Sequence, residues 1–156
     1  MLDGKLHNIN GVFRFKVELD GLLVGGFSEV TGLQAETALQ EYQEGGVNNY
    51  VHQFPKQTKF PKIVLKRGLT GSGDLWEWYE SVIAGKVKRK NGSIIMYSRS
   101  GHEVCRWNFF DAYPVKWAGP DFNATNNNVA IESIELVHNG LKTIHSKMWK
   151  VMGLLE

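Results

Sequence analysis

The stretch FRFKVELDG, residues 13–21, alternates apolar and charged side chains with a period of two. A second stretch near the other end of the chain, VAIESIELVHNGL at residues 129–141, repeats this alternation. Such a period is typical of a β-strand that has one buried face and one solvated face. The two stretches therefore predict a mainly β fold that begins and ends in sheet.

The composition fits a single globular domain over residues 1–156. Hydrophobic residues make up 42% and charged residues 22% of the chain, both within the ordinary range for globular proteins. The apolar runs are only a few residues long, so we expect no direct membrane insertion of the monomer. The first residues lack the basic start and apolar core of a secretory signal, so we expect no signal peptide.

Turn-forming residues divide the middle of the chain into further short strands. The apolar pattern predicts strands at 22–31, with a bend at Gly25-Gly26, at 62–67, at 93–98 after an Asn91-Gly92 turn, and at 103–110, with a separate extended piece at 113–117. The segments 93–98 and 103–110 are expected to form a hairpin, with the turn at Ser100-Gly101.

One helix is expected at about residues 73–85, capped by Ser72 or Asp74. The residues expected on its apolar face are Leu75, Trp76, Tyr79, Val82 and Ile83. A second helical pattern lies at the end of the chain, where Leu141, Ile144, Met148 and Val151 recur at three- and four-residue spacing. It predicts a short C-terminal helix or docking tail within an extension at 142–156. Its target is open between its own domain, a partner subunit and a membrane, and docking on protein is favoured.

The segment 33–54 has few large apolar residues on either face. We expect it to form a long arm or hairpin, and a two-stranded element of this kind is marginal in water without further packing. The sequence therefore predicts that this arm packs against a partner surface.

The residues that carry chemistry are scattered. The five histidines, His7, His52, His102, His138 and His145, show no metal-ligand spacing, and the glycine-rich segment 68–73 lacks the lysine of a phosphate-binding loop. The single cysteine, Cys105, excludes an intramolecular disulfide and is expected to be a small buried residue. We therefore predict no catalytic, cofactor-binding or metal site, and a protein that is not an enzyme.

Two groups of charged residues each allow two interpretations. Arg14, Lys16 and Glu18 on the first strand either line a lumen or face solvent. The basic run Lys86, Lys88, Arg89 and Lys90, near Trp76 and Trp78, either binds nucleic acid or contacts an acidic protein surface. The protein surface is favoured, because basic runs after helices are usually solvated.

Several phrases, taken in order, resemble one family: the inner tail-tube proteins of contractile-tailed phages and of phage-like contractile injection systems. The phrases are FRFKVE at 13–18, GFSEVTGL at 26–33, EYQEGG at 41–46, LKRGLT at 65–70, LWEW at 75–78, WNFFDAYPVKW at 107–117, GP at 119–120, NA at 123–124 and the segment 131–141. Together they cover about residues 9–141. The joint match is specific, although no single phrase is diagnostic.

The resemblance implies two packed antiparallel sheets with one flanking helix, and a hexameric ring that stacks into a tube around a lumen. It also implies contact with sheath, baseplate or spike, and tube-terminator proteins, and passage of protein or DNA cargo. Assembly is expected in the bacterial or host cytoplasm, before the tube becomes part of a phage tail or an extracellular contractile particle. The expected contacts between stacked rings are Glu41, Tyr42, Glu44, Gly45 and Gly46 on the arm.

Three alternatives stay open at this stage. The extension at 142–156 distinguishes the chain from typical family members, so a terminal tube adaptor that joins the tube to the baseplate or spike stays open beside the main tube subunit. A small β-sandwich binding module would stay monomeric. A hydrolase would need a reactive nucleophile that the sequence does not offer.

Overall fold

The computed structural model describes residues 14–46, 49–125 and 129–145. These residues form β1 (Arg14–Leu19), β2 (Leu22–Val24), β3 (Phe27–Thr31), β4 (Glu36–Tyr42), β5 (His52–Lys59), β6 (Ile63–Gly68), α1 (Asp74–Ile83), β7 (Lys90–Tyr97), β8 (Glu103–Ala118), β9 (Ile131–Val137) and β10 (Gly140–His145). The helix has ten residues, and within the described part of the chain no helix is long and apolar enough to cross a membrane.

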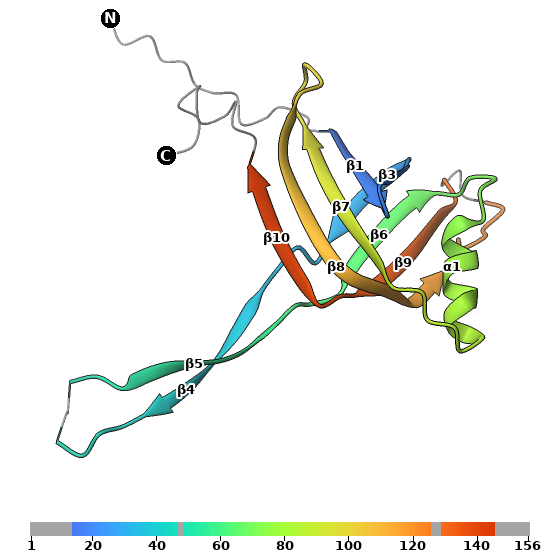
Figure 1. The fold of residues 1–156 in the computed structure, drawn as a ribbon. Coiled ribbons are helices and arrows are strands. Elements are labelled where there is room, and N and C mark those ends of the chain that lie inside the picture. The colour runs from blue at the N-terminus through green and yellow to red at the C-terminus, as the bar shows by residue number, and fades with distance from the viewer. Residues whose placement is uncertain (1–13, 47–48, 126–128, 146–156) are drawn as a thin grey trace, which may run out of the picture.

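The strands form two antiparallel layers that share one strand. The order is β2-β1-β7-β8-β9-β6-β3, and β10 also pairs with β8. The first part of β8 pairs with β7 and β10, whereas its last part pairs with β9 (Figure 1). We call β2-β1-β7-β8-β10 the first layer and β8-β9-β6-β3 the second layer. The predicted mainly β fold is therefore observed.

Strand β8 merges two segments that the sequence pattern separates. The expected strand at 103–110 and the extended piece at 113–117 are one strand of 16 residues. Asp111 interrupts the pattern because it has a positive φ of 53° at a register shift against β7. Its N–H donates to the Asn91 side chain at 3.0 Å. The chain therefore bends at Asp111 without leaving the sheet.

The predicted strand at 22–31 is divided between the two layers. Strand β2 pairs with β1 in the first layer, and β3 pairs with β6 in the second layer. Gly25 and Gly26 lie between β2 and β3, where a bend was expected, and Gly26 has a φ of +83°. The glycine pair therefore carries the chain from one layer to the other.

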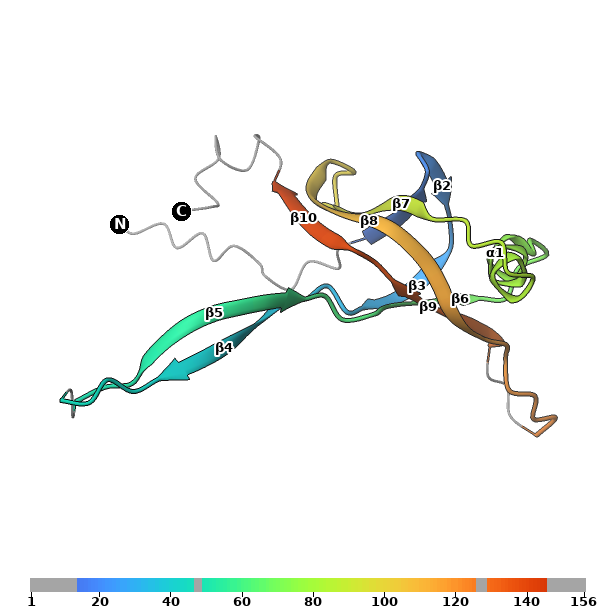
Figure 2. The same cartoon turned by 60° about the horizontal axis from the view of Figure 1, so that its bottom comes forward.

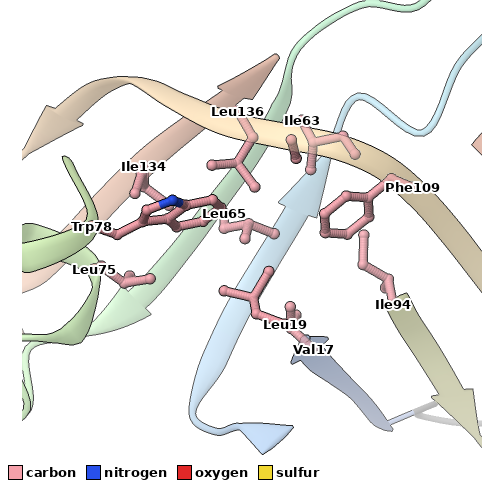
Figure 3. Packing of buried hydrophobic residues seen from close by; sticks show 11 residues of the cluster. Val17, Leu19, Ile63, Leu65, Leu75, Trp78, Ile94, Phe109, Ile134 and Leu136 are labelled. Atoms are coloured by element: carbon pink, nitrogen blue, oxygen red, sulfur yellow. The ribbon is translucent and has the colours of Figure 1, made fainter. Parts of the chain in front are cut away.

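The core lies between the layers, and its side chains come from strands far apart in the sequence (Figure 3). Phe109 is fully buried, and its ring lies over Gly92 of β7. A Cβ atom at Gly92 would come within 2.2 Å of Phe109 Cζ. The expected Asn91-Gly92 turn is therefore wrong: both residues lie inside β7, where the missing side chain makes room for the ring.

The helix agrees with its predicted range, but its cap and its buried face differ. Gly73 is the N-cap residue and makes no side-chain cap hydrogen bond. The buried residues are Leu75 and Trp78, whereas Trp76 is 39% and Ile83 is 63% exposed. The Trp78 indole donates to Lys88 O at 2.8 Å. Trp78 therefore anchors the helix in place of Trp76, because α1 turns this side chain toward the core and the next strand.

The prediction of a C-terminal helix is wrong for residues 140–145. Gly140–His145 form β10, which pairs with β8 and places Leu141 opposite Phe109 and Ile144 opposite Arg106. The backbone hydrogen bonds of β8 favour the strand over the helical spacing seen in the sequence. Met148 and Val151 lie outside the described residues.

Cys105 is 3% exposed, as predicted. Burial of the side chain raises the pKa of its thiol above the ordinary value. We therefore expect the native protein to react with a thiol-specific reagent far more slowly than the protein in denaturant, because the thiolate is the reactive form. Absorbance during the labelling reaction measures this rate. Equal rates in both states would contradict the burial.

Candidate functional site

The hairpin β4–β5 is the most exposed element of the chain. Each described residue from Gln34 to Val51 is exposed, and the hairpin projects away from the two layers (Figures 1 and 2). It forms its own two-stranded sheet, with Thr37 and Thr58 joined through their hydroxyls at 2.8 Å. Because an isolated hairpin is marginal in water, its surface is suited to a partner. We call residues 33–59 the arm.

One face of the arm carries aromatic side chains. Tyr42 lies opposite His52, and Gln40 lies opposite Phe54. The His52 ring contacts Tyr50 at 4.9 Å and Phe54 at 6.3 Å between ring centroids. Tyr42, Tyr50 and Phe54 are 53%, 60% and 52% exposed. We call Tyr42, Tyr50, His52 and Phe54 the aromatic stripe. It is an apolar surface that the monomer leaves open.

The predicted arm residues lie together at the far end of the arm. Glu41 and Tyr42 end β4, and Glu44, Gly45 and Gly46 follow in the loop. All five are exposed. The sequence prediction missed Tyr50, His52 and Phe54, although their spacing of two was a signal that these three side chains share one strand face.

The base of the arm is fixed by Gly32. This residue has a φ of +93°, and a Cβ atom here would lie 2.0 Å from the carbonyl oxygen of Lys62. The strands that enter and leave the arm therefore approach each other closely at this point. Only glycine fits the conformation and the space.

The charged face of β1 that the sequence predicts lies on the outer side of the first layer. Arg14 and Lys16 are exposed, and Lys16 lies 5.1 Å from the centre of the Tyr97 ring. Glu18 is half-buried and accepts a hydrogen bond from Arg106 at 3.0 Å. Arg106 also binds Glu103 at 2.8 Å, and these contacts raise its pKa. This outer face is compatible with a lumen surface and with a surface that faces solvent.

Two residues of the basic run, Arg89 and Lys90, contact aromatic rings of their own subunit. Trp78 is buried in the core, and the Lys90 ammonium lies 5.0 Å from the centre of its ring. Arg89 stacks over Tyr113 at 4.9 Å. Both cations are therefore held against their own subunit, and Trp78 offers no face for a base.

A buried ionic network joins the helix to the second layer. Arg67 of β6 is 2% exposed and binds both Glu132 of β9, at 2.5 Å, and Asp74 at the start of α1. The second carboxylate oxygen of Glu132 accepts a hydrogen bond from the Trp117 indole at 3.2 Å. Both ends of the Glu132 carboxylate therefore have partners.

The Asp74 contact predicts an acid-sensitive helix start. Burial alone would raise the pKa of Asp74, but the hydrogen bond and charge of Arg67 outweigh it and lower the pKa below its ordinary value of 3.8. The stabilisation is therefore complete above the ordinary pKa and is lost as pH falls through the lowered one. We expect Asp74→Asn to flatten this acid limb of stability, measured by urea unfolding from pH 6 down to pH 2. An unchanged limb would contradict the contact.

Among the described residues, no group of three or more His, Cys, Asp or Glu side chains could hold a metal ion. The exposed arm is the most distinctive surface of the described residues. A family model described as T4-like virus tail tube protein gp19 matches residues 11–142, and the chain belongs to this family. This match confirms the resemblance in the sequence.

Solved structures agree with the family. A chain of the PVC sheath-tube complex, an extracellular contractile injection system in the extended state, is 27% identical with a TM-score of 0.79, and the match covers 86% of this chain and 90% of that chain. A chain of the anti-feeding prophage cap, the AFP tube terminating cap, is 27% identical with a TM-score of 0.78 over 85% and 89%. Hcp1 from Flavobacterium johnsoniae, at 19% identity and a TM-score of 0.53 over 85% and 95%, shares the fold.

A search of curated proteins found no match. The family and the structures establish a tail tube protein of contractile injection systems, with the expected pair of antiparallel sheets.

Proposed function

We propose that this protein is the repeating subunit of the inner tube of a contractile injection system or phage tail, and that six copies form each ring. The arm carries this proposal, because its exposed aromatic side chains need a surface that one subunit lacks. Similarity to the PVC sheath-tube complex supports the role. The protein acts by assembly and has no enzymatic activity.

Strand edges are the proposed contacts within a ring. Strand β3 pairs only with β6, and β10 pairs only with β8, among the residues that the structure describes. An open edge offers unpaired backbone groups to other chains and promotes aggregation. Pairing between neighbouring subunits would satisfy these groups and close the ring.

The outer face of the first layer is the proposed lumen surface. Glu18 lies on it, and its carboxylate is already paired with Arg106, whereas Arg14 and Lys16 lie at the edge of this face, beside the corner between β2 and β3. A polar surface of this kind favours passage of a hydrated cargo, either protein or DNA. Sheath, baseplate or spike, and tube-terminator proteins are the proposed external partners. Assembly in the bacterial or host cytoplasm, followed by incorporation into a phage tail or an extracellular particle, fits this role.

The arm is the proposed contact between stacked rings, through Glu41, Tyr42, Glu44, Gly45 and Gly46. Gly46 has a φ of +118°, a conformation that valine resists. We expect Gly46→Val to give folded protein that forms rings but stacks poorly, scored by negative-stain electron microscopy. Normal tubes from this variant would count against the arm tip as the contact.

A terminal tube adaptor is the second candidate. A chain of the AFP tube terminating cap is about as similar to this protein as the chain of the sheath-tube complex, which keeps a role at one end of the tube as a candidate. Ile144, which is exposed on β10, is then the proposed docking contact among the described residues. Electron microscopy of the purified protein over a concentration series separates the two candidates: long tubes support the repeating subunit, isolated rings support the adaptor, and monomers throughout contradict both.

A further inference from the structure

A groove of about 610 Å³ opens at the corner where the chain passes from β2 to β3. Phe15, Val24 and Phe27 supply its apolar lining, and Arg14 and Lys16 add two basic side chains. Neither of these two basic side chains forms a salt bridge with any residue that the structure describes. We call this site the corner groove.

The corner groove has room for side chains from outside the subunit. The pairing of β1 with β2 covers only Val17 to Leu19, so the earlier part of β1 lacks a described strand partner on this side. A Cβ atom at Gly25 would meet no heavy atom within 4 Å. The space at this wall of the groove is therefore open.

The corner groove and the arm lie at opposite ends of the second layer. Strand β3 starts at Phe27, in the groove, and ends at Thr31, next to the base of the arm. Figures 1 and 2 both place the arm on one side of the body and the start of β3 on the other. Two copies stacked along the direction of β3, in the same orientation, would therefore bring the arm of one toward the groove of the next.

We propose that the corner groove receives the arm of a second copy of this chain, with the aromatic stripe inserted among its apolar side chains. This inference rests on the proposed tube function. The arm and the corner groove match in hydrophobicity and in charge. Exposed tyrosine and phenylalanine side chains meet an apolar lining, and the acidic Glu41 and Glu44 meet the basic Arg14 and Lys16. Complementary charges of this kind fix the partner and its register.

The contact is heterologous, because the arm and the groove are different surfaces. A heterologous contact leaves one free arm and one free groove at the ends of every stack. Growth therefore continues by addition of further copies. This property suits a tube of many rings better than a closed pair.

Filling the groove tests the proposal. Gly25→Leu places a side chain in the open space, and the φ of Gly25 lies outside the left-handed region. We expect this variant to keep rings and lose tubes, scored by electron microscopy and sedimentation. The matched control is Gly71→Leu, at another open glycine outside the groove, which should form tubes like the wild type.

A mixing experiment tests the pairing itself. The double variant Tyr50→Ser, Phe54→Ser removes two of the four side chains of the aromatic stripe, both at exposed positions, and leaves its own groove intact. On its own, this variant is expected to form rings that do not stack into tubes. When the two variants are mixed, the intact groove of the double variant accepts the intact arm of Gly25→Leu. The mixture should give stacks of two rings that do not grow, because each stack then exposes only a filled groove and an altered arm.

The outcomes separate this inference from the tube function. Tubes from Gly25→Leu, or a mixture that gives single rings only, would overturn the corner groove as the acceptor while wild-type tubes still support the function. The groove would then belong to another occupant. Wild-type protein that forms neither rings nor tubes would overturn both.

Discussion

Replacing Arg67 with methionine is expected to lower the free energy of unfolding by about 3–5 kcal/mol. Glu132 is 3% exposed, so removal of the guanidinium leaves a buried carboxylate with only the Trp117 indole as a described partner. The start of α1 also loses its contact through Asp74. Urea unfolding followed by tryptophan fluorescence measures the change.

Two further variants control for the charge and for the site. Lys66→Met removes a neighbouring lysine whose ammonium lies 3.6 Å from the Glu29 carboxylate on the outer face. This change should lower the free energy of unfolding by about 1 kcal/mol or less. Adding Glu132→Leu to Arg67→Met removes the buried charge and should recover part of the lost stability. An Arg67→Met variant no less stable than Lys66→Met would contradict the network.

Replacing Gly32 with alanine is expected to cost about 2–5 kcal/mol, because it combines backbone strain with overlap. The added Cβ atom would lie 2.0 Å from the Lys62 carbonyl oxygen, and the φ of +93° disfavours an L side chain. Strands β3 and β6 must therefore separate at the base of the arm. We expect a lower melting temperature, together with fewer and more irregular stacks of rings.

Gly45→Ala is the matched control within the arm. A Cβ atom at Gly45 would meet no heavy atom within 4 Å, and this residue has no left-handed φ, so alanine should fit without loss of stability. Equal melting temperatures for the Gly32 and Gly45 variants would show that the arm base tolerates separation.

Local periodicity was sufficient to predict the strands that have one buried face. The alternation in β1 matches its burial, with Val17 and Leu19 buried and Arg14 and Lys16 exposed. The same rule failed where distant strands decide the structure. The spacing of Leu141 and Ile144 suggested a helix, but pairing with β8 makes this segment a strand. The sequence alone does not reveal that β8 has an open edge there.

The network around Arg67 could not be predicted for a similar reason. Arg67 and Glu132 are far apart in the chain and meet only because β6 pairs with β9. The exposure of the arm could be predicted, since it follows from a local lack of large apolar residues. The corner groove could not, because it exists only after β2 and β3 enter different layers.

Strand β8 also has a mechanical consequence, since one continuous backbone runs through both layers. A force applied to either layer passes to the other through covalent bonds as well as through side-chain packing. Sliding of one layer over the other would stretch this strand or break its pairing with β7 and β9. The domain is therefore stiffer against shear than a sandwich whose sheets are joined only by loops, which suits a part that is pushed without changing shape.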